Sequence, residues 1–223
     1  MTRVYVICEG QTEETFIQKI LFPSLANHQI YLIPRLIGKS GHRGGNVTFE
    51  RLFIDIRALL NDSGAYCTTF FDFYGLQRRF PGKTAAGGHT DLNAKANSLL
   101  QALTERLQEK LGADLLRRFI PYVQMYEFEA LLFSDPVKLA SGIHQPDSQR
   151  ALQAIRDEFP TPEHINDSPN TAPSKRIEQH QRRYRKAKAT LGPEAARVIS
   201  LETIRWECHL FHHWLTRLEA LAP

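Results

Sequence analysis

The stretch that decides the fold lies at the N-terminus and reads Arg3-Val4-Tyr5-Val6-Ile7-Cys8-Glu9-Gly10-Gln11-Thr12-Glu13-Glu14-Thr15-Phe16. A run of β-branched and aromatic residues, followed by a glycine turn and a helical pattern, is typical of the first βα unit of a buried parallel sheet. Glu9 therefore follows the strand at its carboxyl end, which is the edge where open α/β sheets bind ligands. We interpret Glu9 as a candidate catalytic or metal-binding residue. Glu13 and Glu14 are also explained as first-turn acids that complement the helix dipole.

Two later strands are also predicted to end on acidic residues. A strand over about 65–71 leads into Asp72, and a strand over about 118–126 leads into Glu127 and Glu129. Neighbouring parallel strands bring their carboxyl ends together, so these acids are expected beside the glutamate that follows the N-terminal strand. The sequence therefore predicts a cluster of carboxylates at one edge of the sheet.

Each of these later acids has a second interpretation. Asp72 also suits the start of a turn before Gly75. Glu127 and Glu129 are two residues apart, so only one of them needs to face a common site. Asp135 precedes a proline and is better explained as the N-cap of a helix.

The remaining pattern predicts an α/β domain with a helical extension. Helices are expected at about 12–26, 48–60 and 91–111, and a further apolar strand at about 30–37. This alternation favours a mostly parallel four-stranded sheet flanked by helices over residues 1–140. Helical patterns at about 147–158 and 201–221, joined by a polar segment with several prolines, predict a C-terminal extension over 141–223.

Two glycine-containing loops suggest phosphate contacts without forming a phosphate-binding loop motif. Gly38-Lys39-Ser40 and Gly82-Lys83-Thr84 both lack the glycine that the motif needs five residues before its Gly-Lys pair. The stretch from about 75 to 90 is rich in glycine and basic residues, and we expect a mobile basic loop there. Arg78, Arg79 and Lys83 in this loop are candidate nucleic-acid contacts.

The distribution of positive charge points to an anionic partner. The formal net charge is +4, and the pI is near 9.0. Between positions 175 and 188 the only acid is Glu178, and the basic residues there are Lys175, Arg176, Arg182, Arg183, Arg185, Lys186 and Lys188. Such a block is typical either of a solvated helix face or of a surface that contacts nucleic-acid phosphates.

Composition is that of an ordinary soluble globular protein, with 42% hydrophobic and 23% charged residues. No apolar run is long enough to span a bilayer, and no basic leader precedes the first strand, so we expect a cytoplasmic protein without a membrane partner. Three widely spaced cysteines predict no disulfide framework. Cys208 lies near His209, His212 and His213, but the second Cys/His pair typical of structural zinc sites is missing, so this segment is expected to pack.

A set of motifs in order along nearly the whole chain resembles a known family. The motifs are Glu9-Gly10-Gln11-Thr12-Glu13, Asp72-Phe73-Tyr74-Gly75, Glu127-Phe128-Glu129-Ala130-Leu131-Leu132-Phe133, Pro173-Ser174-Lys175-Arg176-Ile177 and Cys208-His209-Leu210-Phe211. The chain resembles the toprim-like family catalogued as domain of unknown function 4276. That resemblance implies a relation to the topoisomerase-primase (toprim) domain and to the nuclease half of overcoming-lysogenisation-defect proteins. It also implies a place beside a separate ATPase in bacterial defence loci.

The same resemblance implies roles for particular residues. The toprim glutamate falls on Glu9, and the first aspartate of the family's Asp-x-Asp pair falls on Asp72. The position of the second aspartate holds Tyr74, so Glu127 or Glu129 is expected to supply the missing ligand. Clustered carboxylates repel one another, and a hard cation such as Mg²⁺ or Mn²⁺ with oxygen ligands relieves that repulsion.

The expected function is that of a metal-dependent nuclease subunit that hydrolyses phosphodiester bonds of DNA or RNA. It is expected to act in bacterial defence with a separate ATPase partner, and a homo-oligomer is compatible with the sequence. The alternative is a non-catalytic module that binds nucleic acid or a protein partner and keeps a degraded toprim site. A third reading, a small-molecule phosphotransferase or phosphatase, would share the site but would not need the basic surfaces.

Overall fold

A computed structural model describes residues 1–38, 44–166 and 170–223 of the chain. Most of the Gly38-Lys39-Ser40 loop and part of the proline-containing segment, including Pro169, lie outside the described residues.

A parallel sheet forms the centre of the molecule, as the sequence predicts. The strand order is β2-β1-β3-β4, and β5 also pairs with β3. The strands are β1 (Thr2–Cys8), β2 (Ile30–Leu36), β3 (Ala65–Asp72), β4 (Phe119–Ile120) and β5 (Val123–Gln124). Cys8 pairs with Leu36 on one side and with Phe70 on the other, so β1 lies at the centre and its carboxyl end adjoins that of β3.

The sheet has five strands where four were expected, because the strand predicted over 118–126 is divided in two. Pro121 lies between β4 and β5 and has no N–H to donate to the ladder. Both short strands pair with β3 in parallel, with Cys67 opposite Phe119 and Asp72 opposite Gln124. The division therefore leaves the chain on the same path and delivers residue 127 to the same edge.

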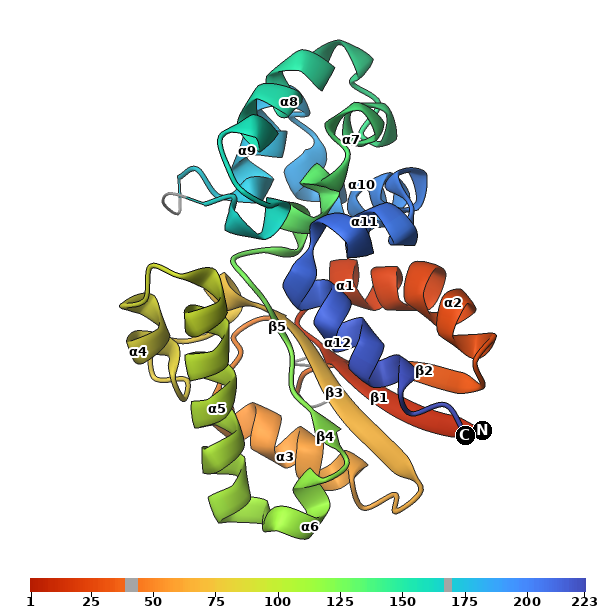
Figure 1. Ribbon diagram of the computed structural model, residues 1–223, viewed down its shortest axis with the longest axis vertical. Coiled ribbons are helices and arrows are strands. Elements are labelled where there is room, and N and C mark those ends of the chain that lie inside the picture. Colours follow the sequence, from red (N-terminus) through yellow and green to blue (C-terminus); the bar gives the residue numbers. More distant parts are fainter. Residues whose placement is uncertain (39–43, 167–169) are drawn as a thin grey trace.

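Helices cover both faces of the sheet. One set lies in about the first half of the chain: α1 (Gln11–Phe16), η1 (Ile17–Leu21), α2 (Phe22–Ala26), α3 (Phe49–Leu59), η2 (Phe73–Gly75), α4 (Lys83–Gly87), α5 (Leu92–Leu111) and α6 (Ala113–Leu116). In Figure 1, α3 and α5 lie on one side of the sheet, and α1 and α2 on the other. Each side has its own cluster of buried hydrophobic residues.

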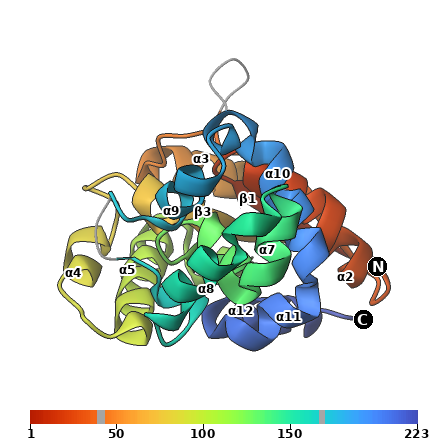
Figure 2. The same cartoon turned by 90° about the horizontal axis from the view of Figure 1, so that it is seen from above.

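The C-terminal segment is helical, as predicted. Its elements are η3 (Phe128–Ser134), α7 (Pro136–Gly142), η4 (Pro146–Ser148), α8 (Gln149–Asp157), η5 (Pro162–His164), α9 (Pro173–His180), α10 (Tyr184–Ile199), α11 (Leu201–Glu207) and α12 (His209–Glu219). Figures 1 and 2 show α7, α8, α9 and α10 grouped beyond the carboxyl edge of the sheet, whereas α12 returns along its face. The C-terminus thus ends beside the N-terminus, where the Thr2 hydroxyl donates to the Leu221 carbonyl at 2.9 Å.

Two stretches differ from the sequence expectation. The helix predicted over 201–221 is two helices that meet at Cys208, and the buried Glu163 carboxylate accepts the N–H groups of Leu210 and Phe211 at the start of the second. The stretch from 75 to 90 is not a mobile loop but contains α4, and Phe80 and Ala86 within it are buried. In both stretches the structure depends on contacts with distant residues. The local periodicity of the sequence does not show such contacts.

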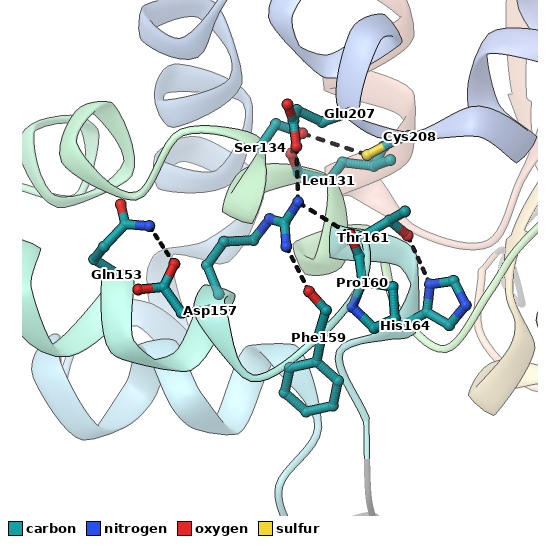
Figure 3. Close-up of polar contacts among 11 residues, drawn as sticks. Leu131, Ser134, Gln153, Asp157, Phe159, Pro160, Thr161, His164, Glu207 and Cys208 are labelled. Carbon is teal, nitrogen blue, oxygen red and sulfur yellow. Dashed lines mark hydrogen bonds and ion pairs between the residues drawn. The ribbon is translucent and has the colours of Figure 1, made fainter.

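Polar contacts join the C-terminal helices to one another (Figure 3). The Arg156 guanidinium at the end of α8 forms an ion pair with Glu207 of α11 at 2.8 Å and donates to the Phe159 carbonyl at 2.7 Å. Cys208 is buried, and its sulfur lies 3.3 Å from the Ser134 hydroxyl, so its side chain is packed in the interior of the protein. No helix in the described part of the chain is long and apolar enough to cross a membrane.

Trp214 connects α12 to the sheet. Its ring is stacked on Tyr122 at a centroid separation of 4.5 Å and on Phe70 at 5.4 Å, and its indole N–H donates to the Thr68 hydroxyl at 2.8 Å. The C-terminal helix therefore contributes to the same core as β3, although 146 residues separate Trp214 from Thr68.

We predict that Trp214→Ala lowers the free energy of unfolding by about 3–5 kcal/mol, because it leaves a large cavity and removes the buried hydrogen bond to the Thr68 hydroxyl. Trp206, which is 80% exposed, is the matched control, and Trp206→Ala is expected to change stability by less than about 0.5 kcal/mol. Urea denaturation of the three proteins measures the difference. Equal effects of the two substitutions would contradict the packing of α12 on the sheet.

Candidate functional site

Glu9 and Asp72 lie together at the carboxyl edge of the sheet, as predicted from the strands that they follow. The backbone N–H of Asp72 donates to Glu9 Oε2 at 3.2 Å. The Glu9 carboxylate rests against Gly75, where a Cβ would collide with it. Glycine is therefore required at position 75 for the glutamate to reach this place.

Glu127 and Glu129 flank the first two acids. The Phe128 N–H between them donates to Asp72 Oδ1 at 2.7 Å, so the turn that carries both glutamates is held against the end of β3. Glu127 is half-buried and accepts the Ser174 N–H at 2.8 Å. Glu129 is 1% exposed and accepts the Tyr184 hydroxyl at 3.3 Å. Both carboxylates thus lie at the edge, each with a different partner.

Glu13 is a fifth acid at this edge. Its Oε2 accepts the Gly10 N–H at 2.8 Å, which forms the backward arm of a capping box for α1. The side chain is only 4% exposed, which is unusual for an acid that merely complements a helix dipole. It is close enough to Asp72 and Glu9 for their charges to interact.

Burial and mutual repulsion keep several of these carboxyls from ionising easily. Burial, with a contribution from Glu9, raises the pKa of Glu13 to about 7. Burial also raises the pKa of Asp72 well above its usual range, and the neighbouring carboxylates, Glu13 first, add to that rise. Burial raises the pKa of Glu9 as well, although the Asp72 N–H counteracts it. The protein groups at this edge therefore do not fully compensate the negative charge that would develop if all of these carboxyls were ionised.

The Lys188 ammonium interacts with several carboxylates of this cluster. Burial raises the pKa of Glu129 to about 7, and the Lys188 ammonium opposes that rise. The pKa of Lys188 is raised in turn, chiefly by Glu129 and then by Asp72 and Glu13. Its side chain is nevertheless exposed, so the ammonium lies at the rim of the cluster, where an anionic ligand can reach it.

Sequence reasoning missed Lys188 and Tyr184 as site residues. In the sequence, Lys188 stands out only as the last cation of the basic block. The signal that could have found it is the spacing of four residues from Tyr184, which puts both side chains on one face of α10. Gly192 lies one turn further along the same face. A Cβ at position 192 would lie 3.0 Å from the Phe128 ring of η3, so glycine lets α10 and η3 approach each other closely.

The donor set suits a hard divalent cation, because it consists of carboxylate oxygens in a buried setting with excess negative charge. Each carboxylate, however, is engaged by its own donor. Within the described ranges, no three acidic, histidine or cysteine side chains are gathered closely enough to bind one ion. Side chains such as Glu127 would have to move toward a common point in order to bind one.

The predicted nucleic-acid contacts fall into two groups. The exposed ones are Arg78, Arg79, Arg182, Arg183 and Arg185, and Lys83 is half-buried.

Lys175 and Arg176, the other two predicted nucleic-acid contacts, form polar contacts within the protein. Lys175 forms an ion pair with Glu178 at 2.8 Å. Arg176 is buried, donates to the Thr171 carbonyl at 2.8 Å and lies 3.6 Å from the Glu158 carboxylate. Its environment favours a structural role.

The C-terminal region of the Burkholderia pseudomallei OLD protein superimposes with a TM-score of 0.51, at 14% identity, with 100% of each chain covered. At this identity the likeness concerns the fold alone, and it supports the α/β fold that the sequence predicts. No curated protein matches the chain.

The family model described as domain of unknown function (DUF4276) matches residues 8–219, a span that includes all five acids of the edge and Lys188. Because this match covers nearly the whole chain, the protein belongs to the DUF4276 family.

Proposed function

We propose that this protein is a metal-dependent nuclease subunit that hydrolyses phosphodiester bonds in DNA or RNA. The observation that carries the proposal is the gathering of buried carboxylates, with a lysine at their rim, at the carboxyl edge of a toprim-like sheet. A structural role alone does not explain it, because buried acids that repel one another destabilise a fold. Functional sites are where such pKa shifts are concentrated.

Each residue has a proposed role. Glu9 and Asp72, with Glu127 or Glu129, would hold Mg²⁺ or Mn²⁺. A bound cation would supply electrostatic stabilisation of the charge that develops on the phosphate. Glu9 is placed to ligate the ion or to accept a proton from the attacking water. The Lys188 ammonium would hold a substrate phosphate at the rim and neutralise part of its charge.

The wider proposal concerns substrate and partners. Exposed arginines on the turn after β3 and at the start of α10 supply positive charge for a nucleic-acid backbone. We also propose a separate ATPase partner and a role in bacterial defence. The chain has no phosphate-binding loop motif in its sequence, and it shares its fold with part of an OLD protein.

The second candidate is a non-catalytic module that binds nucleic acid or a protein partner. Two observations favour it: Tyr74 stands where the toprim family has its second aspartate, and the described carboxylates are engaged by backbone and hydroxyl donors. The two candidates differ in whether adding a divalent cation changes the protein, which the first experiment below measures.

We predict that saturating Mg²⁺ or Mn²⁺ raises the melting temperature by roughly 5–10 °C, since a ligand at about 100 times its Kd adds about 2.7 kcal/mol to stability. Glu9→Gln and Asp72→Asn should each abolish this shift and lower cleavage of plasmid or RNA by about 10²-fold or more. Differential scanning fluorimetry and gel assays measure the two effects.

Glu14→Gln is the matched control, because Glu14 lies on the same helix as Glu13 but lines a separate hollow with Arg35 and Asp55. It should keep both the shift and the cleavage. Cleavage that survives Glu9→Gln, or a thermal shift lost equally in Glu14→Gln, would refute the assignment of the site.

We predict that the metal-free protein loses stability as the pH rises from about 4.5 to about 7. The pKa values of Glu13 and Glu129 are near 7 in the folded protein against 4.5 for an unperturbed glutamate, so the folded state binds more protons in this window. Below a pH of about 4.5 the two groups contribute their full stabilisation, and this contribution is lost as the pH rises through about 7. Each of the two groups alone is expected to contribute a loss on the order of 3 kcal/mol to the free energy of unfolding, since one unit of pKa shift corresponds to about 1.4 kcal/mol.

Urea denaturation at a series of pH values measures this loss. Glu129→Gln should flatten the profile, and Mg²⁺ should restore stability at the alkaline end, because it binds the ionised carboxylates. A metal-free protein whose stability rises steadily from pH 5 to pH 8 would show that the edge carboxyls ionise without cost.

We predict that the arginines at the start of α10 contact the nucleic-acid backbone. Replacing Arg182, Arg183 and Arg185 by alanine should weaken binding and reduce the slope of log K against log salt by about 2–3, since each phosphate contact contributes about 0.9. Fluorescence anisotropy in a salt series measures the slope. Lys19, Lys110 and Arg150, which are exposed elsewhere, form the matched triple control. Equal slopes for the two triple variants would identify the block as a solvated face.

A further inference from the structure

Two tyrosines form an aromatic pair beside the carboxylate edge. Tyr74 lies two residues after Asp72, and Tyr126 directly precedes Glu127. Their ring centroids are 5.7 Å apart at an interplanar angle of 44°, and both side chains are half-buried. The Tyr74 N–H donates to the Tyr126 carbonyl at 3.1 Å, so the backbone itself holds the pair together. The pair is therefore a fixed part of the edge with partly accessible rings.

Tyr126 has an unusual backbone conformation. Its φ is +65°, in the left-handed region that a residue with a Cβ rarely adopts. Such conformations persist where the surrounding structure holds them, and they are concentrated at functional sites. Here the conformation places the Tyr126 ring against Tyr74 and Phe73.

Two lysines lie over these rings. The Lys83 ammonium is 3.2 Å from the centroid of Phe73 and 5.8 Å from that of Tyr74, and it donates to the Phe73 carbonyl. The Lys95 ammonium is 5.1 Å from the centroid of Tyr126 and donates to its hydroxyl at 3.1 Å. Among the residues that the structure describes, the polar partners of both ammonium groups are thus a carbonyl and a phenol.

The two ammonium groups repel each other and lie near the acidic edge. Burial lowers the pKa of Lys83 to about 8, the charge of Lys95 adds to this fall, and Glu9 opposes it. A pair of cations that affect each other in this way is stabilised by an anion placed between or beside them. Phosphate is such an anion. Because Glu9 interacts with Lys83, the phosphate to be cleaved at Glu9 would lie close to these lysines.

We propose that Tyr74, Tyr126, Lys83 and Lys95 bind one unpaired nucleotide of a single-stranded nucleic acid, with its base on the tyrosine rings and its phosphate on the lysines. Aromatic rings flanked by cations match a base joined to a phosphate. In a duplex the faces of the bases are stacked on one another, so only an unpaired nucleotide can use the rings. The proposal deepens the nuclease function, because it assigns a substrate class to the same edge.

The test measures binding without catalysis, so that it does not depend on whether the protein cleaves. Fluorescence anisotropy in EDTA is recorded with a fluorescein-labelled oligothymidine, with oligouridine and with a blunt duplex of mixed sequence. Tyr74→Leu and Tyr126→Leu should each weaken binding of the single strands by roughly 5- to 100-fold, whereas the Phe variants, which keep the ring, should weaken it much less. Duplex binding should change by less than about 2-fold, because stacked bases do not reach the rings.

Lys95→Met should weaken binding of both single strands and reduce the salt slope by about 0.7, the value for one phosphate contact on a single strand. The matched controls are Trp206→Leu, which removes an exposed aromatic residue elsewhere, and Lys110→Met, about 22 Å away along the same helix. Both should bind like the wild type. Preference for oligouridine or for oligothymidine identifies RNA or DNA as the source of the nucleotide.

Leu variants that fold and bind single strands as tightly as their Phe counterparts would overturn the proposal, as would equal losses on single strand and duplex. Thermal melting of each variant checks folding, and Lys95→Met provides an independent reading if a tyrosine variant does not fold. A wild type that binds single strands through the tyrosines but never cleaves would refute the nuclease function and leave this inference intact.

Discussion

Repulsion among buried carboxylates at the carboxyl edge of the sheet is the constraint on which the rest of the structure depends. β1 and β3 are neighbours, so Glu9 and Asp72 meet, and the turn after β5 adds two more acids. Each carboxylate is offset by a donor from another part of the chain: the N–H groups of Asp72, Phe128 and Ser174 and the hydroxyl of Tyr184. Hydrogen bonds to the charged form are what keep such a cluster compatible with a folded protein.

The C-terminal helices supply part of the groups that compensate these carboxylates. α9 supplies the Ser174 N–H, and α10 supplies Tyr184 and Lys188. α12 returns along the sheet and fixes this group of helices to the core through Trp214. The helical extension is therefore part of the site, because without α10 the cluster would lose both its hydroxyl donor and its cation.

The sequence predicts the sheet and the positions of Glu9 and Asp72 at its edge well, because both depend on short-range patterns. An apolar run followed by an acid places Glu9 and Asp72 at a strand end whatever the rest of the chain does. Pro121 could have been interpreted as a break in the fourth strand. The roles of Tyr184 and Lys188 could not be predicted, since the contact of Tyr184 with Glu129 spans 55 residues and depends on how α10 packs.

A crystal structure with Mn²⁺, located by its anomalous scattering, tests the central claim most directly. If the edge is a cation site, one anomalous peak lies within about 2.0–2.6 Å of oxygens of both Glu9 and Asp72, with Glu127 or Glu129 turned toward it. A protein that shows no peak at the edge in saturating Mn²⁺, with Glu9 still on the Asp72 N–H and Glu127 still on the Ser174 N–H, would contradict the claim.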